Sequence, residues 1–136
     1  MRPRSATRLL ATALLCLLTI GAAAVSYDMP NRHELKRADL SGAPGMEVIT
    51  SISEYQPGET IPRHLHHGVE TGYVLQGSTV QVPGQAATRL ETGAPIMNPR
   101  DVPHAGFKVV GNSPFKVVTV HGVDKGKPLY DAPPTQ

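Results

Sequence analysis

Two histidines and a glutamate lie close together near the middle of the chain, at a spacing that suits metal binding. His64 and His66 are two residues apart, and Glu70 follows after Gly68. On a β-strand, residues i and i+2 point to the same face, so both imidazoles can reach one ion. A turn at Gly68 would bring the carboxylate back beside the pair. This stretch alone is equally consistent with solvated histidines at the end of a polar strand.

The residues around this cluster follow a longer pattern. Residues 58–77 read GETIPRHLHHGVETGYVLQG, which resembles the first motif of the cupin family at every fixed position. Residues 93–108 read GAPIMNPRDVPHAGFK, which resembles the second cupin motif. Gly93, Pro99 and His104 are in register, whereas Asp101 stands in place of a glycine and Lys108 in place of an asparagine.

The resemblance covers about residues 46–121 and implies both a fold and a ligand set. The implied fold is an all-β double-stranded β-helix, a small jelly-roll barrel of six to eight strands. The implied metal ligands are His64, His66, Glu70 and His104. Three neutral imidazoles and one carboxylate suit a divalent transition metal (Fe, Mn, Ni, Co, Cu or Zn) without selecting one. A six-coordinate ion would keep two positions open for water, oxygen or a bidentate substrate.

Four further side chains are candidates for lining a pocket beside the ion: Tyr73, Met97, Phe107 and His121. Core packing is the simpler interpretation for the aromatic residues, because aromatic rings usually supply buried area. His121 closes the last predicted strand and is expected at the surface, unless the parity of that strand turns it inward. No residue outside the ligand set stands out as a catalytic acid or base.

The remaining polar residues near the motifs are expected in solvent. His67 should point to the strand face opposite His66, and Arg63 should also point outward. Arg100 and Asp101 should form a surface turn with an ion pair or a cap. Glu54 should be a solvated strand end.

Short hydrophobic runs broken by Gly and Pro predict the strands that carry these residues, and helical periodicity is absent. A first strand begins at Met46 and stops at Gln56-Pro57-Gly58. Hairpin turns are predicted at 75–78 and at Pro83-Gly84. The other predicted strands span 59–66, 71–75, 78–82, 86–90, 95–98, 102–108 and 115–121. Together they predict one β-barrel domain over residues 46–123.

The segments on either side of this domain are polar and rich in Pro and Gly. Residues 25–45 are predicted to form an extended arm that adds an edge strand or reaches a partner subunit. Residues 124–136 are predicted to be a frayed tail. Exposed sheet edges and the arm favour a homodimer.

The first 24 residues have the features of a secretory signal peptide: three arginines, an uncharged apolar run, and Ala22-Ala23-Ala24 at its end. The run is shorter than a membrane span, so no stable span is expected after cleavage. Cys16, the only cysteine, lies within it. The mature domain would then be cysteine-free and exported, either periplasmic or secreted. It would also be nearly neutral, with 13 − 3 = 10 basic residues against 11 acidic ones, which does not indicate nucleic-acid binding.

Two functional classes fit this sequence. One is a metalloenzyme that acts on a small oxygen-bearing molecule, and within it a dioxygenase is favoured over an isomerase or a lyase. The alternative is a non-catalytic module that binds a metal or small ligand. A fold by itself does not decide between them.

Overall fold

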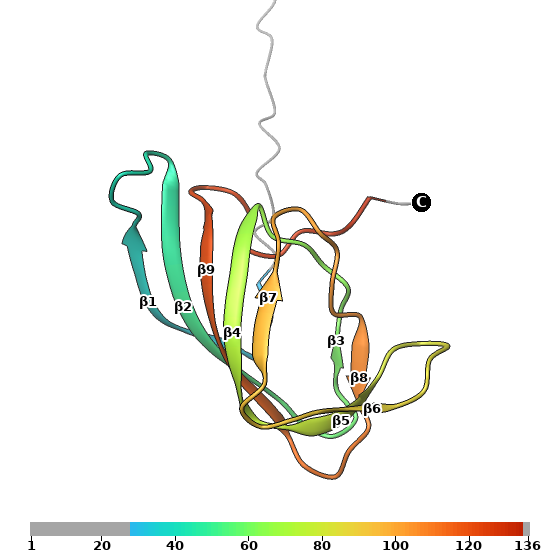
Figure 1. Ribbon diagram of the computed structural model, residues 1–136. Helices are drawn as coiled ribbons and strands as arrows, with labels where there is room; N and C mark the ends of the chain where they lie inside the picture. The colour runs from blue at the N-terminus through green and yellow to red at the C-terminus, as the bar shows by residue number, and fades with distance from the viewer. Residues whose placement is uncertain (1–27, 135–136) are drawn as a thin grey trace, which may run out of the picture.

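A computed structural model describes residues 28–134, which fold as β-strands and loops. The strands make two antiparallel sheets, ordered β1-β2-β9-β4-β7 and β3-β8-β5-β6, which curve toward each other as the walls of a barrel (Figure 1). The predicted all-β jelly-roll fold is therefore confirmed. Nine strands are found in this range, one more than expected, and β1 is the addition. Their bounds are β1 (Arg32–Asp39), β2 (Met46–Tyr55), β3 (Thr60–Ile61), β4 (Gly68–Gln76), β5 (Ser78–Gln81), β6 (Thr88–Leu90), β7 (Pro95–Asn98), β8 (Phe107–Val109) and β9 (Phe115–Asp124).

Strands β2 and β9 form the centre of the larger sheet. They pair without interruption from Met46↔Asp124 to Tyr55↔Phe115. Buried and partly buried residues alternate along both strands, as expected when one face of a sheet lines a core. Among the apolar residues of these two strands, Ile49 is the most buried, with 1% of its surface exposed. Because of this alternation, the odd-numbered residues of both strands face the barrel interior.

The predicted hairpin at 75–78 is wrong. Strand β4 belongs to the five-stranded sheet and β5 to the four-stranded sheet, so the chain passes from one wall to the other at Gly77. A Cβ atom at Gly77 would overlap the backbone of Leu90 and Thr92, which explains why glycine is needed there. The predicted turn at Pro83-Gly84 is correct, because β5 pairs with β6 across it and Gly84 has a φ of 75°.

Both ends of the described chain are attached to the barrel. The arm contributes β1, which pairs antiparallel with β2 at the edge of the larger sheet. The expectation of a frayed tail is wrong for residues 129–131. Leu129 and Tyr130 are buried in the core, and the backbone of Asp131 exchanges two hydrogen bonds with Leu65, at 3.0 and 3.1 Å. The predicted signal peptide lies outside the described residues, and no helix within 28–134 could span a membrane.

Candidate metal centre

Three strands of the larger sheet place polar side chains in one row inside the barrel. In the strand register, Glu70 on β4 lies opposite His121 on β9 and opposite Asn98 on β7. Directly paired residues of an antiparallel sheet point to the same face. The sheet therefore fixes a carboxylate, an imidazole and an amide side by side.

The other three histidines come from loops. Strand β3 ends at Ile61, so the predicted strand 59–66 is much shorter than expected, and Pro62 follows its end. His64 instead forms an isolated antiparallel bridge with His104, with backbone hydrogen bonds of 3.1 and 2.8 Å. His64 and His66 nevertheless both turn inward, with 6% and 1% of their surface exposed and ring centroids 4.9 Å apart.

Backbone carbonyls orient these three rings. His64 Nδ1 lies 2.8 Å from the carbonyl oxygen of Pro62, His66 Nδ1 lies 2.5 Å from that of Leu129, and His104 Nδ1 lies 2.9 Å from that of Val102. A carbonyl oxygen only accepts, so each Nδ1 carries the proton and donates it. In a neutral imidazole, Nε2 then holds the lone pair that a metal ion needs.

Glu70 lies among the imidazoles. Its Oε2 is 3.4 Å from His66 Nε2 and 3.2 Å from His104 Nε2, and its Oε1 is 3.4 Å from His121 Nε2. The Asn98 amide donates a 2.6 Å hydrogen bond to Oε2 and holds the carboxylate in place. The four residues predicted as ligands thus converge, and His121 joins them.

The donor atoms fit a metal ion. Potential ligand atoms lie within 4.8 Å of one another in two overlapping groups, His64-His66-His104 and His66-Glu70-His121. Nε2 of His66 and of His104 and both ring nitrogens of His121 are buried without a hydrogen-bond partner. Buried polar atoms are normally paired, and unpaired ones indicate a missing water or ion. The cluster could therefore hold a metal ion.

Burial also keeps the histidines ready to bind. It lowers the pKa of His64 to about 4, so this ring is neutral across the physiological range. Burial likewise lowers the pKa of His121. For Glu70, burial would raise the pKa, but the contacts from His104, His121 and His66 outweigh it and hold the pKa well below its usual range. An ionised carboxylate thus lies beside His64 and His121, whose lowered pKa values favour the neutral imidazole.

A cavity of about 220 Å³ opens beside the cluster and includes His64, Glu70 and His104 in its wall. Phe107 lines it, as proposed from the sequence. The rest of the wall is mostly apolar or aromatic: Ser53, Tyr55, Ile61, Leu90, Ile96, Asn98, Ala105, Phe115, Val117, Thr119 and Tyr130. Such a wall suits a small, largely apolar ligand.

Three sequence predictions for pocket residues need correction. Tyr73 and Met97 are 52% and 66% exposed, because they lie on the outer face of β4 and β7, opposite in parity to Glu70 and Asn98. His121, expected at the surface, is fully buried. The odd-numbered residues of β9 face the barrel interior, so His121 points inward and lies near the pocket.

Of the polar residues expected in solvent, Arg63, Arg100 and Asp101 are exposed, whereas Glu54 and His67 are partly buried. His67 points away from the cluster, and its ring contacts Asp101 at 2.9 Å and Asp131 at 3.1 Å. Arg100 pairs with Asp124 at 2.8 Å. Asp101 has a φ of 59°, a left-handed conformation that glycine and aspartate adopt more readily than most residues. This explains how it replaces the glycine of the second motif.

Asn98, Leu129 and Tyr130 were missed from the sequence. Asn98 lies two residues after Ile96 on the inward face of β7, so the alternation along this strand could have identified it as an inward-facing residue. Tyr130 packs its ring against His64 and His66, with centroids 4.8 and 5.1 Å away, and burial raises its pKa. No local pattern marks Leu129 and Tyr130, because a long-range contact places them.

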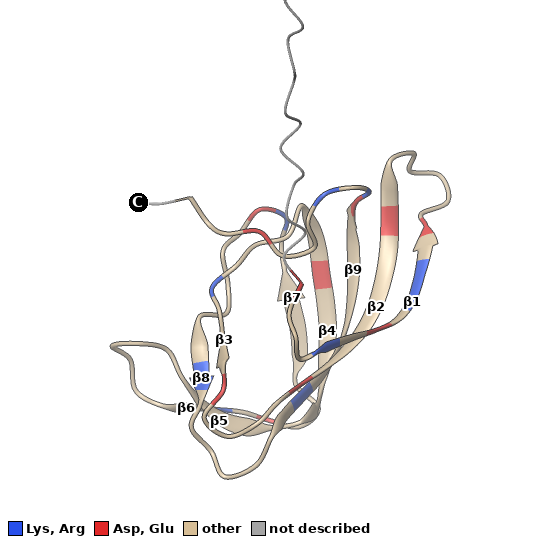
Figure 2. Ribbon diagram, turned by 180° about the vertical axis from the view of Figure 1, so that it is seen from behind, with Lys and Arg blue, Asp and Glu red and all other residues tan. Residues whose placement is uncertain are grey.

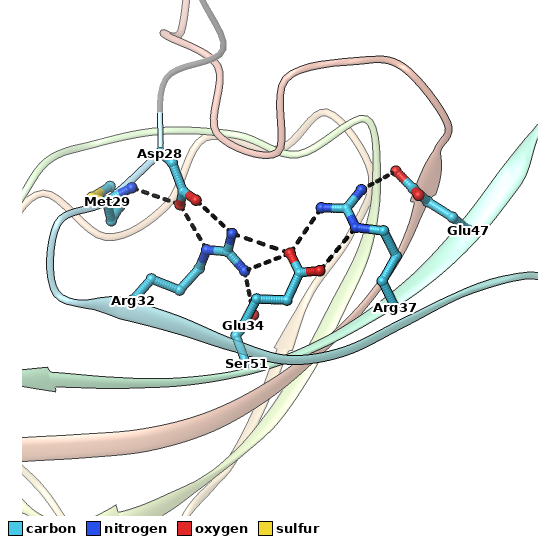
Figure 3. Close-up of polar contacts among 7 residues, drawn as sticks. All are labelled: Asp28, Met29, Arg32, Glu34, Arg37, Glu47 and Ser51. Atoms are coloured by element: carbon cyan, nitrogen blue, oxygen red, sulfur yellow. Dashed lines mark hydrogen bonds and ion pairs between the residues drawn. The ribbon is translucent and has the colours of Figure 1, made fainter.

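A second polar cluster, here called the arginine network, lies between β1, β2 and the residues before β1 (Figure 3): Asp28, Arg32, Glu34, Arg37, Glu47 and Ser51. The Arg32 side chain, only 5% exposed, donates to both carboxylate oxygens of Asp28 at 2.6 and 2.5 Å and to Ser51 Oγ at 2.6 Å. Arg37 joins Glu34 to the buried Glu47. Basic and acidic segments alternate along β1, whereas the charged residues of β2 are acidic (Figure 2).

A family model described as a cupin domain matches residues 51–121 of the chain. No curated protein matches significantly. A conserved protein with a double-stranded β-helix domain from Klebsiella pneumoniae is 22% identical, with a TM-score of 0.49 over 62% of this chain and 76% of that one. The DMSP lyase DddQ from Ruegeria pomeroyi is 21% identical, with a TM-score of 0.50 over 65% of this chain but only 45% of its own. The polyketide cyclase RemF from Streptomyces resistomycificus is 23% identical, with a TM-score of 0.48 over 63% of this chain and 70% of that one. Identities this low bear on the fold alone.

Proposed function

This chain belongs to the cupin family, and from that membership we propose that it binds one divalent transition-metal ion through His64, His66, Glu70 and His104. The observation that carries the proposal is the set of buried, unpartnered Nε2 atoms beside the Glu70 carboxylate. The donor set of nitrogen and oxygen suits Fe, Mn, Ni, Co, Cu or Zn.

We propose further that the site is catalytic and acts on a small oxygen-bearing molecule. A bound ion supplies Lewis-acid or oxygen-activating chemistry. The protein contributes orientation: the carbonyls of Pro62, Leu129 and Val102 hold the imidazoles, and Asn98 holds the carboxylate. The apolar cavity wall supports binding of the substrate's hydrocarbon part while its oxygen faces the ligand cluster.

Among the reactions open to such a site, we propose an oxygen-dependent dioxygenase. Isomerases and lyases commonly use a protein base near the substrate to remove a proton. Apart from the ligand residues, the cavity wall contains no carboxylate, lysine or cysteine. Tyr55 and Tyr130 line it, and burial raises the pKa of Tyr130, so this phenol stays protonated at neutral pH and is not a base. This wall favours chemistry that depends on the metal and O₂.

Metal analysis of protein purified from its native compartment tests the first proposal, with His66→Ala as the variant and the exposed His33→Ala as its matched control. We expect about one ion per wild-type chain, the same in the His33 variant, and little in the His66 variant. Equal metal in both variants would refute the site. A screen for small molecules that cause O₂ uptake on the loaded protein then tests the reaction. Ligand binding without turnover would indicate the non-catalytic binding module instead.

We also propose that the protein is exported and that residues 1–24 are removed, on the basis of the basic start and apolar run. N-terminal sequencing of protein from the native host would reject this if the chain began at Met1. The exposed edge strand β1, with Leu35 52% exposed, supports a homodimer through sheet edges. A monomer mass at micromolar concentration would count against it.

A further inference from the structure

We infer that His121 is a fifth protein ligand of the metal ion, in addition to the four residues of the cupin motifs. The inference rests on the proposed metal site and extends it. It comes from three properties of this side chain: its register, its burial and its lack of hydrogen bonds.

The sheet register fixes His121 against the cluster. His121 is the direct partner of Glu70 across β4 and β9. Its ring centroid is 4.6 Å from that of His66, and its Nε2 is 3.4 Å from Glu70 Oε1. His121, His66 and Glu70 all place a potential ligand atom within 4.8 Å of the other two. Two imidazoles and a carboxylate form a donor group that binds divalent iron and its neighbours.

A purely structural role explains His121 poorly. It is 0% exposed, and neither ring nitrogen has a hydrogen-bond partner. Its neighbours at the inward positions of β9 are Thr119, at 5% exposure, and Val123, at 4%, so apolar or small side chains are accommodated on this face. A buried imidazole whose one polar contact is at 3.4 Å, to Glu70 Oε1, is costlier than an apolar residue of similar size. Ligation of an ion removes that cost.

Ligation by His121 also reduces the number of coordination positions that stay open on the ion. His64, Glu70 and His104 line the cavity, whereas His66 and His121 do not. Five protein ligands would leave a six-coordinate ion only one open position. The cavity borders three of the five ligands, so we place that position on the cavity side. The substrate class that fits is then a molecule that binds the ion through a single oxygen atom, and O₂ would react with the bound substrate rather than at a second position on the ion.

His121→Leu separates the two roles, because leucine fills the space without a donor atom. We expect the metal-free variant to unfold at the same urea concentration as the wild type or higher, since unpaired polar atoms are removed. We expect its Kd for Co²⁺, measured by chelator competition, to rise at least ~10-fold. His33→Leu, on the exposed side of β1, is the matched control and should leave the Kd unchanged.

Proton NMR of the Co²⁺ form distinguishes a ligand from a residue that merely orients Glu70. Each ligating imidazole contributes one shifted exchangeable ring N–H signal, so four are expected in the wild type and three in His121→Leu. If His121→Leu does not fold, His121→Asn serves instead, because its amide is too short to reach the position of Nε2. An unchanged Kd, with three signals in both the wild type and the variant, would overturn the inference while leaving the four-ligand site intact. A wild-type protein that binds no Co²⁺ would refute both.

Discussion

Truncation after Lys127 should damage both the fold and the metal centre, because residues 128–131 form part of each. The deletion removes the buried side chains of Leu129 and Tyr130, each worth about 1.5–3 kcal/mol. It also removes the Leu129 carbonyl that accepts from His66 Nδ1, and an unsatisfied buried donor costs about 1–3 kcal/mol. The combined loss of about 4–9 kcal/mol is comparable to the whole stability of a small domain, about 5–15 kcal/mol.

Urea denaturation of the metal-free protein measures this loss, and chelator competition measures the effect on metal affinity. Leu129→Ala is the milder variant: we expect a loss of about 2–5 kcal/mol, with metal affinity of the folded protein largely retained because the backbone carbonyl stays. A chain that ends at Ala132 is the matched control and should behave as the wild type. If the chain that ends at Lys127 kept the wild-type midpoint and metal affinity, the tail would not be part of the site.

Three further predictions concern single residues. The pKa of His64 falls from about 6.5 in the unfolded chain to about 4 in the fold, so the unfolded state binds more protons between these values. The contribution of His64 to the stability of the metal-free protein should therefore be complete above pH ~6.5, and up to ~3 kcal/mol should be lost as the pH falls through 4. Urea titrations at several pH values measure this dependence, and it should be weaker in His64→Asn. His67→Ala should leave the metal content unchanged and lower the free energy of unfolding by under ~1 kcal/mol, because only the contacts to Asp101 and Asp131 are lost. Loss of metal in this variant would disprove the outward orientation of His67. Gly77→Ala should lower the thermal midpoint by several degrees, equivalent to ~1–3 kcal/mol, and an unchanged midpoint would show that the bend between sheets tolerates a side chain.

Local sequence patterns predicted the parts of the site that local geometry determines. The spacing of His64 and His66 and the glycines around them identified the first motif, although Pro62 stops the strand on which the parity argument relied. His64 and His66 still converge, because the backbone bridge between His64 and His104 holds this loop in an extended conformation. A continuous strand would have had the same effect. The convergence of these side chains was therefore predictable, but the backbone element that carries them was not.

What could not be predicted depends on contacts between distant residues. Alternation along β9 is visible in the sequence, but which face of β9 points inward is decided by its pairing with β2 and β4. His121 was therefore expected at the surface. The tail was expected to fray because it is polar overall, yet two apolar side chains, Leu129 and Tyr130, suffice to bury it against the cluster.

A divalent ion bound at the proposed site would balance the charge of the arginine network. A divalent ion with the Glu70 carboxylate and neutral imidazoles leaves a net charge of about +1. The network holds three carboxylates, Asp28, Glu34 and Glu47, against two guanidinium groups, Arg32 and Arg37, which leaves −1. Burial is the main cause that lowers the pKa of His121, the contact with Glu70 opposes it, and His66 and then Arg32 add smaller lowering effects. A neighbouring positive charge disfavours protonation of that ring and so favours the form that binds metal. The arginine network therefore has two effects: it holds the edge strand β1 against the barrel, and through Arg32 it favours the neutral form of His121.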